Sequence, residues 1–269
     1  MRAMRTSAIV TYRGADGSDR RANLDAVLAW LAATPDVKAI VVEQDSFPRL
    51  VAPLPHPSAR VVFAYNAGPF NKAWGLNVGA RHASGGVFLL GDADVIVPGG
   101  LAQAAAICAS SMQVVKPYRT LVDLTPDETA HVRRGHAGER LDLDPGARRD
   151  RDAIGERLVL CGGWFAMRRD AFAALGGFDE RFVGWGGEDD AMTLKVELAR
   201  LSTCELDPGP ALHLWHPRSH ATTLGHADYA SNVALLADYA RYDESTLARL
   251  FEVGRQTFGH RDKYVPADR

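Results

Sequence analysis

The sequence lacks the features that would place it in several large classes of protein. Its 269 residues include only three cysteines, which are isolated and form no C-x-x-C pair, so neither a disulfide framework nor a cysteine zinc site is indicated. No apolar run approaches the roughly 20 residues of a transmembrane helix, and the N-terminus lacks a signal-peptide core. A net charge of −2 gives no indication of nucleic-acid binding. We therefore expect a cytoplasmic protein.

The composition that remains is that of an ordinary globular protein. Hydrophobic residues make up 46% of the chain and charged residues 24%, which is enough for a large core. Short apolar runs alternate with segments of helical spacing. We expect strands at residues 7–12, 37–43, 60–64, 86–90 and 112–116, and helices after residue 18 or 19 and at residues 71–82 and 101–109. This alternation predicts an α/β fold with a mostly parallel central sheet that helices flank on both faces.

Composition also divides the chain into four parts. Residues 1–120 hold the alternation of strands and helices. Residues 121–157 are rich in charge and poor in large apolar side chains, which is typical of either a flexible surface loop or a functional lid. Apolar patterns return in residues 158–254, and residues 255–269 are expected to form a polar, peripheral tail.

Three consecutive acids follow a Trp-Gly-Gly turn at residues 185–190, and a helical pattern begins at once. Glycines at such a place are typical of a backbone that comes close to a ligand. Acids at the start of a helix are also favoured by the helix dipole alone. The block is therefore either a helix cap or part of a functional site.

Asp92 and Asp94 come directly after an apolar predicted strand. Ligands of open α/β sheets collect at the carboxyl ends of strands, and alternate residues of an extended segment face the same side. We therefore expect both carboxylates to point into one cleft, where they could share Mg²⁺ or Mn²⁺. His213 and His216 precede Pro217, which argues against a continuing helix. Imidazole combined with carboxylate suits Mn²⁺, so either histidine could complete the metal shell.

Taken in the order in which they occur along the chain, these motifs resemble the metal-dependent GT-A glycosyltransferases. The likeness is greatest to the β-1,4-galactosyltransferase-like group and the bacterial family-2 enzymes related to it. The resemblance covers roughly residues 8–216 and is carried by five motifs, namely PFNKA (69–73), LNVG (76–79), GGWFA (162–166), GF (177–178) and WGGEDD (185–190). Lys72 stands where the group commonly has Arg, and His213 where the animal enzymes have a metal-binding Met. The animal enzymes' secretory anchor is absent, which points to a soluble bacterial-type relative.

The resemblance implies a single GT-A (Rossmann-like) domain that binds a UDP-sugar. Residues 1–120 would be the nucleotide-sugar-binding half, which ends in the region of Asp92 and Asp94, and residues 158–254 the acceptor-binding and catalytic half. The implied reaction is an inverting transfer of a hexose or N-acetylhexosamine to an acceptor hydroxyl. The acceptor would be an unknown glycan or a small molecule.

The resemblance also implies a role for individual residues. Asp189 would be the general base, and Glu188 would bind the acceptor or the sugar. Asp94 and His216 would hold Mn²⁺ or Mg²⁺, with His213 as a further ligand. The expected contacts to the donor are Tyr12, Arg13, Asp45, Phe70, Lys72, Asp92 and Trp185.

Two other functions stay open at this point. The chain could be a nucleotide-sugar or glycan-binding module without turnover. It could also be a metal hydrolase that uses His213, His216 and carboxylates to hold Zn²⁺ and activate water. The sequence leaves the identity of the donor sugar open.

Overall fold

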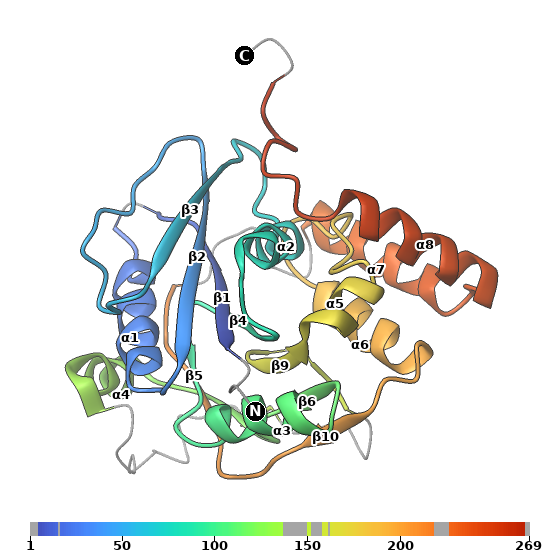
Figure 1. The fold of residues 1–269 in the computed structure, drawn as a ribbon. Coiled ribbons are helices and arrows are strands. Elements are labelled where there is room, and N and C mark those ends of the chain that lie inside the picture. Colours follow the sequence, from blue (N-terminus) through green and yellow to red (C-terminus); the bar gives the residue numbers. More distant parts are fainter. Residues whose placement is uncertain are drawn as a thin grey trace.

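The computed structural model describes residues 5–15, 17–136, 150–151, 158–160, 162–217 and 226–266 (Figure 1). These residues form a seven-stranded sheet with the order β10-β6-β9-β4-β1-β2-β3 and a four-stranded sheet with the order β5-β11-β7-β8. The strands are β1 (Thr6–Tyr12), β2 (Val37–Asp45), β3 (Arg60–Tyr65), β4 (Val87–Asp92), β5 (Val95–Ile96), β6 (Val114–Lys116), β7 (Leu121–Asp123), β8 (Asp150–Arg151), β9 (Phe165–Arg168), β10 (Thr203–Glu205) and β11 (Ala211–His213). The helices are α1 (Arg20–Ala32), α2 (Lys72–His82), α3 (Leu101–Ser110), α4 (Pro126–His131), η1 (Val132–His136), α5 (Arg169–Ala174), α6 (Glu188–Leu198), α7 (Ala227–Tyr239) and α8 (Glu244–Thr257).

Strand β1, in the large sheet, shows why the chain folds in layers. All seven of its residues are buried, and it pairs in parallel with β2 and with β4. Successive side chains of a strand point to opposite faces, so Ala8 and Val10 pack in a core with α1 and α3, whereas Ile9 packs in another with α2 and α5. The α/β fold predicted from the sequence, with a mostly parallel sheet between helices, is confirmed (Figure 1).

Strands from both sides of residue 120 share the large sheet. Strand β9 lies between β4 and β6 and is antiparallel to both, and β10 pairs with β6 at the edge. The division of the chain at residue 120 is therefore a division of sequence composition that the sheet does not follow.

The first part of the charged segment 121–157 is regular structure, which differs from the loop expected there. Leu121 and Val122 are buried and pair with β11, and a capping box of Thr125 and Glu128 starts α4. Val132 then buries its side chain in the core. A few well-placed apolar residues were enough to order the segment as far as residue 136. Residues 137–149 and 152–157 lie outside the described ranges.

The C-terminal residues, expected to be peripheral, pack against α2 as far as they are described. The indole N–H of Trp74 donates to the backbone oxygen of His260 at 2.8 Å. The Trp74 ring also packs edge-on against Tyr264, with 4.8 Å between the ring centroids. The expectation was wrong because it was based only on the polarity of this segment. Its polar backbone groups form hydrogen bonds with buried side chains such as Trp74.

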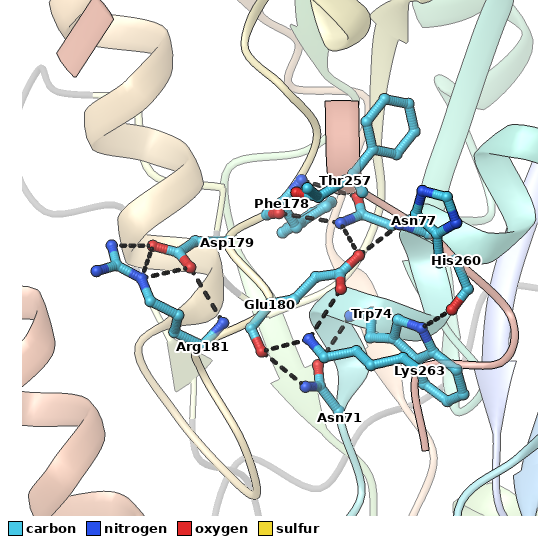
Figure 2. A network of polar contacts seen from close by, with 12 residues as sticks. Asn71, Trp74, Asn77, Phe178, Asp179, Glu180, Arg181, Thr257, His260 and Lys263 are labelled. Carbon is cyan, nitrogen blue, oxygen red and sulfur yellow. Dashed lines mark hydrogen bonds and ion pairs between the residues drawn. The ribbon is translucent and has the colours of Figure 1, made fainter. Parts of the chain in front are cut away.

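Glu180 joins this C-terminal segment to α2 (Figure 2). Its carboxylate accepts hydrogen bonds from the Asn77 side chain at 2.9 Å and from the backbone of Gly259, and it pairs with Lys263 at 2.9 Å. Its backbone oxygen accepts from Asn71, the residue before Lys72.

The described helices include none long and apolar enough to cross a membrane.

Replacement of Glu180 by alanine tests this connection. We expect Glu180→Ala to lower the free energy of unfolding by about 2 kcal/mol, because the buried Asn77 side chain and Gly259 N–H would lose their acceptor. Urea unfolding measures the change. The control is Glu252→Ala on α8, whose exposed ion pair with Arg255 should contribute little to stability. Equal stability losses in the two variants would contradict the assignment.

Candidate active site

Lys72 is the first residue of α2, and the start of this helix is fixed at the carboxyl ends of β1 and β2. Asn71 caps the helix with its side chain. Gln44 at the end of β2 donates to the Asn71 backbone oxygen at 2.8 Å and to the Thr11 hydroxyl at 2.6 Å. Gly75 lets the helix lie this close, since a Cβ atom there would come within 2.2 Å of the Thr11 hydroxyl. The ammonium group of Lys72 is thereby placed at the strand ends.

Three carboxylates surround this ammonium group. Its nitrogen lies 2.7 Å from Asp92 and 2.8 Å from Asp189, and 3.7 Å from Glu188. Asp92 ends β4, whereas the other two acids open α6. All four side chains are between 12% and 24% exposed. We call these four residues the Lys72 cluster; it joins the two parts of the chain that were expected to bind donor and acceptor.

The protonation of the Lys72 cluster is set by burial and by mutual charge. Burial raises the pKa of Asp189, Lys72 draws it down, and Glu188 and Asp92 raise it again, which leaves it at about 7. Burial likewise raises the pKa of Glu188 against the opposing charge of Lys72. For Lys72, burial would lower the pKa, but the carboxylates hold it well above its usual value. Asp189 thus exchanges a proton near neutral pH beside a permanent cation, as suits a general base.

Asp94 meets His213 and His216 because of the pairing of β5 with β11. The two strands are antiparallel and place His213 opposite Val95, the residue after Asp94. One Asp94 oxygen lies 3.2 Å from His216 Nε2, and the other lies 3.8 Å from His213 Nε2. One ligand atom from each of the three residues lies within 4.8 Å of the others. We call them the Asp94 triad; they could hold one metal ion.

The donor set of the Asp94 triad fits the expected cofactor. A carboxylate is a usual ligand of Mn²⁺, and two imidazoles beside it can hold a divalent transition metal. His213 is already oriented for ligation. Its Nδ1 lies 2.7 Å from Asp123 on β7, the parallel neighbour of β11, so its Nε2 faces Asp94. A carboxylate on the second ring nitrogen is the usual support of a metal-binding histidine. Sequence reasoning missed Asp123, because it lies in the segment that was read as a loop.

Asp92 and Asp94 do not point toward a common cation, which corrects the expectation from their alternation. The strand ends at Asp92, and the chain turns before β5 begins at Val95. A turn breaks the alternation of an extended segment, so Asp92 contacts Lys72 while Asp94 contacts the histidines. The two acids stand in adjacent sites.

Arg20 is a basic residue near the Asp94 triad that sequence reasoning also missed. Burial would raise the pKa of Asp94, but the hydrogen bond with His216 and the charges of His213, His216 and Arg20 lower it to about 2. Arg20 begins α1, which follows β1. A basic residue at the start of the first helix after a strand was the available signal, because the carboxyl ends of strands bind anions in such sheets.

The glycines of the Trp-Gly-Gly turn serve the backbone itself. Gly184, Gly186 and Gly187 have φ of 78°, 93° and 91°, a region that other residues rarely adopt. A Cβ atom on Gly184 would also lie 2.8 Å from the Asp228 side chain on α7. The sequence left open a helix cap or close approach to a ligand; the close contacts observed at these glycines are with the protein's own side chains. The three acids that follow form the first turn of α6, as the helix-cap interpretation predicts.

The remaining expected donor contacts lie at the ends of β1 and β2 and before α2. Tyr12 is buried, and Asp45 pairs with Arg49 at 3.0 Å. The Arg13 guanidinium lies 5.7 Å from the centre of the Phe70 ring. Arg13 also donates to three backbone carbonyl groups, those of Gln44, Asn66 and Gly68. These contacts hold the loop before α2, and a role toward a nucleotide stays a prediction.

Trp185 is 39% exposed and stacks on Tyr229 of α7, with 5.2 Å between ring centroids and 26° between the planes. One face of the indole is therefore covered by the protein. Sequence reasoning missed Tyr229, which lies beyond every motif of the resemblance.

Comparison with known proteins supports the resemblance in the second half of the chain. Residues 157–217 match the family model described as the N-terminal domain of galactosyltransferase. Human β-1,4-galactosyltransferase 4 is 33% identical over 94 residues, which is 34% of this chain and 27% of that protein. The chain thus aligns with about a quarter of the length of this relative. The other curated relatives are from mouse, rat and Chinese hamster, so these matches do not support the expected bacterial origin.

Solved structures confirm the GT-A fold over nearly the whole chain. A mannosyltransferase from Pyrobaculum calidifontis, in complex with GDP-Man and Mn²⁺, matches with a TM-score of 0.53 and 17% identity over 94% of this chain and 69% of its own. Glucosyl-3-phosphoglycerate synthase from Mycobacterium tuberculosis, in complex with Mn²⁺, UDP-glucose and phosphoglyceric acid, matches with a TM-score of 0.54 and 17% identity. This match covers 90% of this chain and 82% of that protein's chain. The chain therefore has a GT-A fold and is similar in sequence to galactosyltransferases.

Calorimetric titration with Mn²⁺ tests the Asp94 triad. We expect His216→Ala to abolish measurable binding, because two ligands remain, and Asp123→Asn to weaken it about 10-fold to 100-fold through the loss of orientation at His213. His226→Ala is the control and should bind like the wild type, since the His226 ring caps the start of α7. Unchanged affinity in His216→Ala would place the metal elsewhere.

Proposed function

We propose that this protein is a metal-dependent glycosyltransferase that moves a hexose or N-acetylhexosamine from a UDP-sugar to an acceptor hydroxyl with inversion. The observation that carries the proposal is the adjacency of the Lys72 cluster and the Asp94 triad, which are linked through Asp92 and Asp94. One of them holds a base that titrates near neutral pH, and the other offers ligands for a divalent cation. The proposed metal-dependent, inverting transfer uses both functions.

The Asp94 triad serves the departing diphosphate. Asp94, His213 and His216 would hold Mn²⁺, or Mg²⁺ in its place, and the bound ion would supply neutralising charge for the leaving group. Arg20 adds a further positive charge beside the triad. Mn²⁺ accompanies a nucleotide-sugar in the two solved structures described above, with UDP-glucose in one and GDP-Man in the other. We assign the donor to the UDP class on the likeness to galactosyltransferases.

The Lys72 cluster serves the acceptor and the transferred sugar. Asp189 accepts the proton of the acceptor hydroxyl as its oxygen attacks the anomeric carbon opposite to the diphosphate. A single displacement of this kind inverts the anomeric configuration and needs no enzyme nucleophile. Glu188 and Asp92 accept hydrogen bonds from sugar hydroxyls, and Lys72 fixes the direction of all three carboxylates.

Aromatic and polar residues around the two clusters complete the proposed substrate sites. The exposed face of Trp185 packs against a sugar ring and excludes water. Tyr12, Arg13, Asp45 and Phe70 line the strand ends where the nucleotide binds. The acceptor is a glycan or a small molecule with a free hydroxyl.

Loss of the base tests the function directly. With Mn²⁺ and a panel of UDP-sugars and sugar acceptors, the wild type should release UDP and form product of inverted configuration. Asp189→Asn should lower kcat by about 100-fold to 10,000-fold because the base is lost, while donor binding persists. Asp190→Asn, in the same turn of α6, is the matched control and should retain activity.

The outcomes of these assays separate the alternatives. UDP binding without turnover in the wild type would identify a binding module. Stoichiometric zinc that survives dialysis, with hydrolase activity, would identify a metal hydrolase. Loss of donor binding in Asp189→Asn would remove Asp189 from the role of base.

The pH dependence of the reaction follows from the pKa of Asp189. The base must be unprotonated, and its pKa in the free protein is about 7. We therefore expect kcat/KM to be level above this pH and to fall about tenfold for each pH unit below it. Initial rates at saturating metal, measured over about two pH units on either side of this pKa, give the profile. An acid limb near pH 4 would contradict the proposed base.

A further inference from the structure

Helix α7 supports the turn that carries Trp185 and leads into α6. Asn232 of α7 is only 4% exposed and faces the backbone of this turn. Its side-chain N–H group donates to the Val183 oxygen at 2.8 Å and to the Trp185 oxygen at 3.3 Å. Its side-chain oxygen accepts from the Val183 N–H at 3.3 Å. The buried Asn232 side chain thus supplies hydrogen-bond partners to the backbone of Val183 and Trp185.

The other contacts of α7 explain why the turn is rich in glycine. A Cβ atom on Gly186 would lie 3.1 Å from the Tyr229 ring, and one on Gly187 would lie 2.8 Å from Phe182 and 3.6 Å from Asn232. The turn lies flat against α7 because it has no side chains at these points. Contacts with α7 therefore stabilise the conformation of this turn, and the turn thereby positions the start of α6.

The turn is also tied to the loop before α2. The Gly184 N–H donates to the Phe70 oxygen at 2.7 Å, two residues before Lys72. The segment held by Asn232 therefore has Lys72 on one side and Glu188 with Asp189 on the other. A shift of this segment would change the distances within the Lys72 cluster.

We propose that Asn232 is a positioning residue for Asp189. Helix α7 lies outside the residues that match the galactosyltransferase model, so this support is a property of this chain beyond that match. The inference rests on the proposed function in its catalytic part, because Asp189 is the base there. Its structural part, that Asn232 fixes the turn, stands on the contacts alone.

Three variants test the inference. Asn232→Ala removes all three hydrogen bonds, and Asn232→Asp keeps the shape and one acceptor while losing both donated bonds. Ser231→Ala is the matched control, because the Ser231 hydroxyl donates to the Ala227 backbone oxygen within α7. Steady-state kinetics with a UDP-sugar and Mn²⁺ would be combined with amide hydrogen exchange of the peptide that contains residues 183–187.

We expect Asn232→Ala to lower kcat about 10-fold to 100-fold through misplacement of the base, with the donor KM and Mn²⁺ affinity unchanged. The 183–187 amides should exchange faster, and Ser231→Ala should match the wild type in both readouts. Asn232→Asp should show the same pattern and serves if the alanine variant does not fold.

Two results would overturn the inference. The first is unchanged exchange at residues 183–187 in folded Asn232 variants, which would mean that α7 does not fix the turn. The second is faster exchange with unchanged kcat, which would limit Asn232 to stability. If the wild type itself transfers no sugar, the proposed function fails, and the exchange measurement still decides the structural part.

Discussion

The ion pairs of Lys72 with three carboxylates are the interaction on which the rest of the site depends. Asp92, Glu188 and Asp189 are partly or largely buried around one point, and their carboxylates would repel one another without a cation among them. Lys72 opposes this repulsion and still leaves the pKa of Asp189 at about 7. The same contacts join the end of β4 to the start of α6. The ion pairs that balance the charges of the site therefore also hold its elements together.

The surrounding structure can be understood as support for these few side chains. Gln44 and Asn71 fix the start of α2, and Glu180 ties that helix to the C-terminal segment. On the opposite side, α7 holds the glycine turn from which α6 begins. Rigid support of this kind matters because a general base works only within hydrogen-bond reach of its proton. Elements far apart in the sequence therefore meet around one ammonium group.

The sequence was sufficient for the features that depend on local pattern. Apolar periodicity predicted five strands of the large sheet, β1 to β4 and β6, together with helices α1, α2 and α3, but it did not predict β9 or β10. Residue type and position in the sequence marked Asp94, His213 and His216 as candidate metal ligands, and the structure brings them together. Features that depend on pairing between distant segments were out of reach. The two-residue strand β5 turns Asp94 away from Asp92, and no periodicity can reveal so short a strand. The polar C-terminal segment is held by hydrogen bonds to buried partners, which composition does not register.

The most direct test of this account is the pH profile of Lys72→Met beside that of the wild type. Loss of the ammonium group removes the charge that lowers the pKa of Asp189, so burial and the neighbouring acids would act unopposed. We predict that the acid limb of kcat/KM moves to higher pH and that activity recovers in alkaline solution. An acid limb that stays at the wild-type position would contradict the central role given to Lys72.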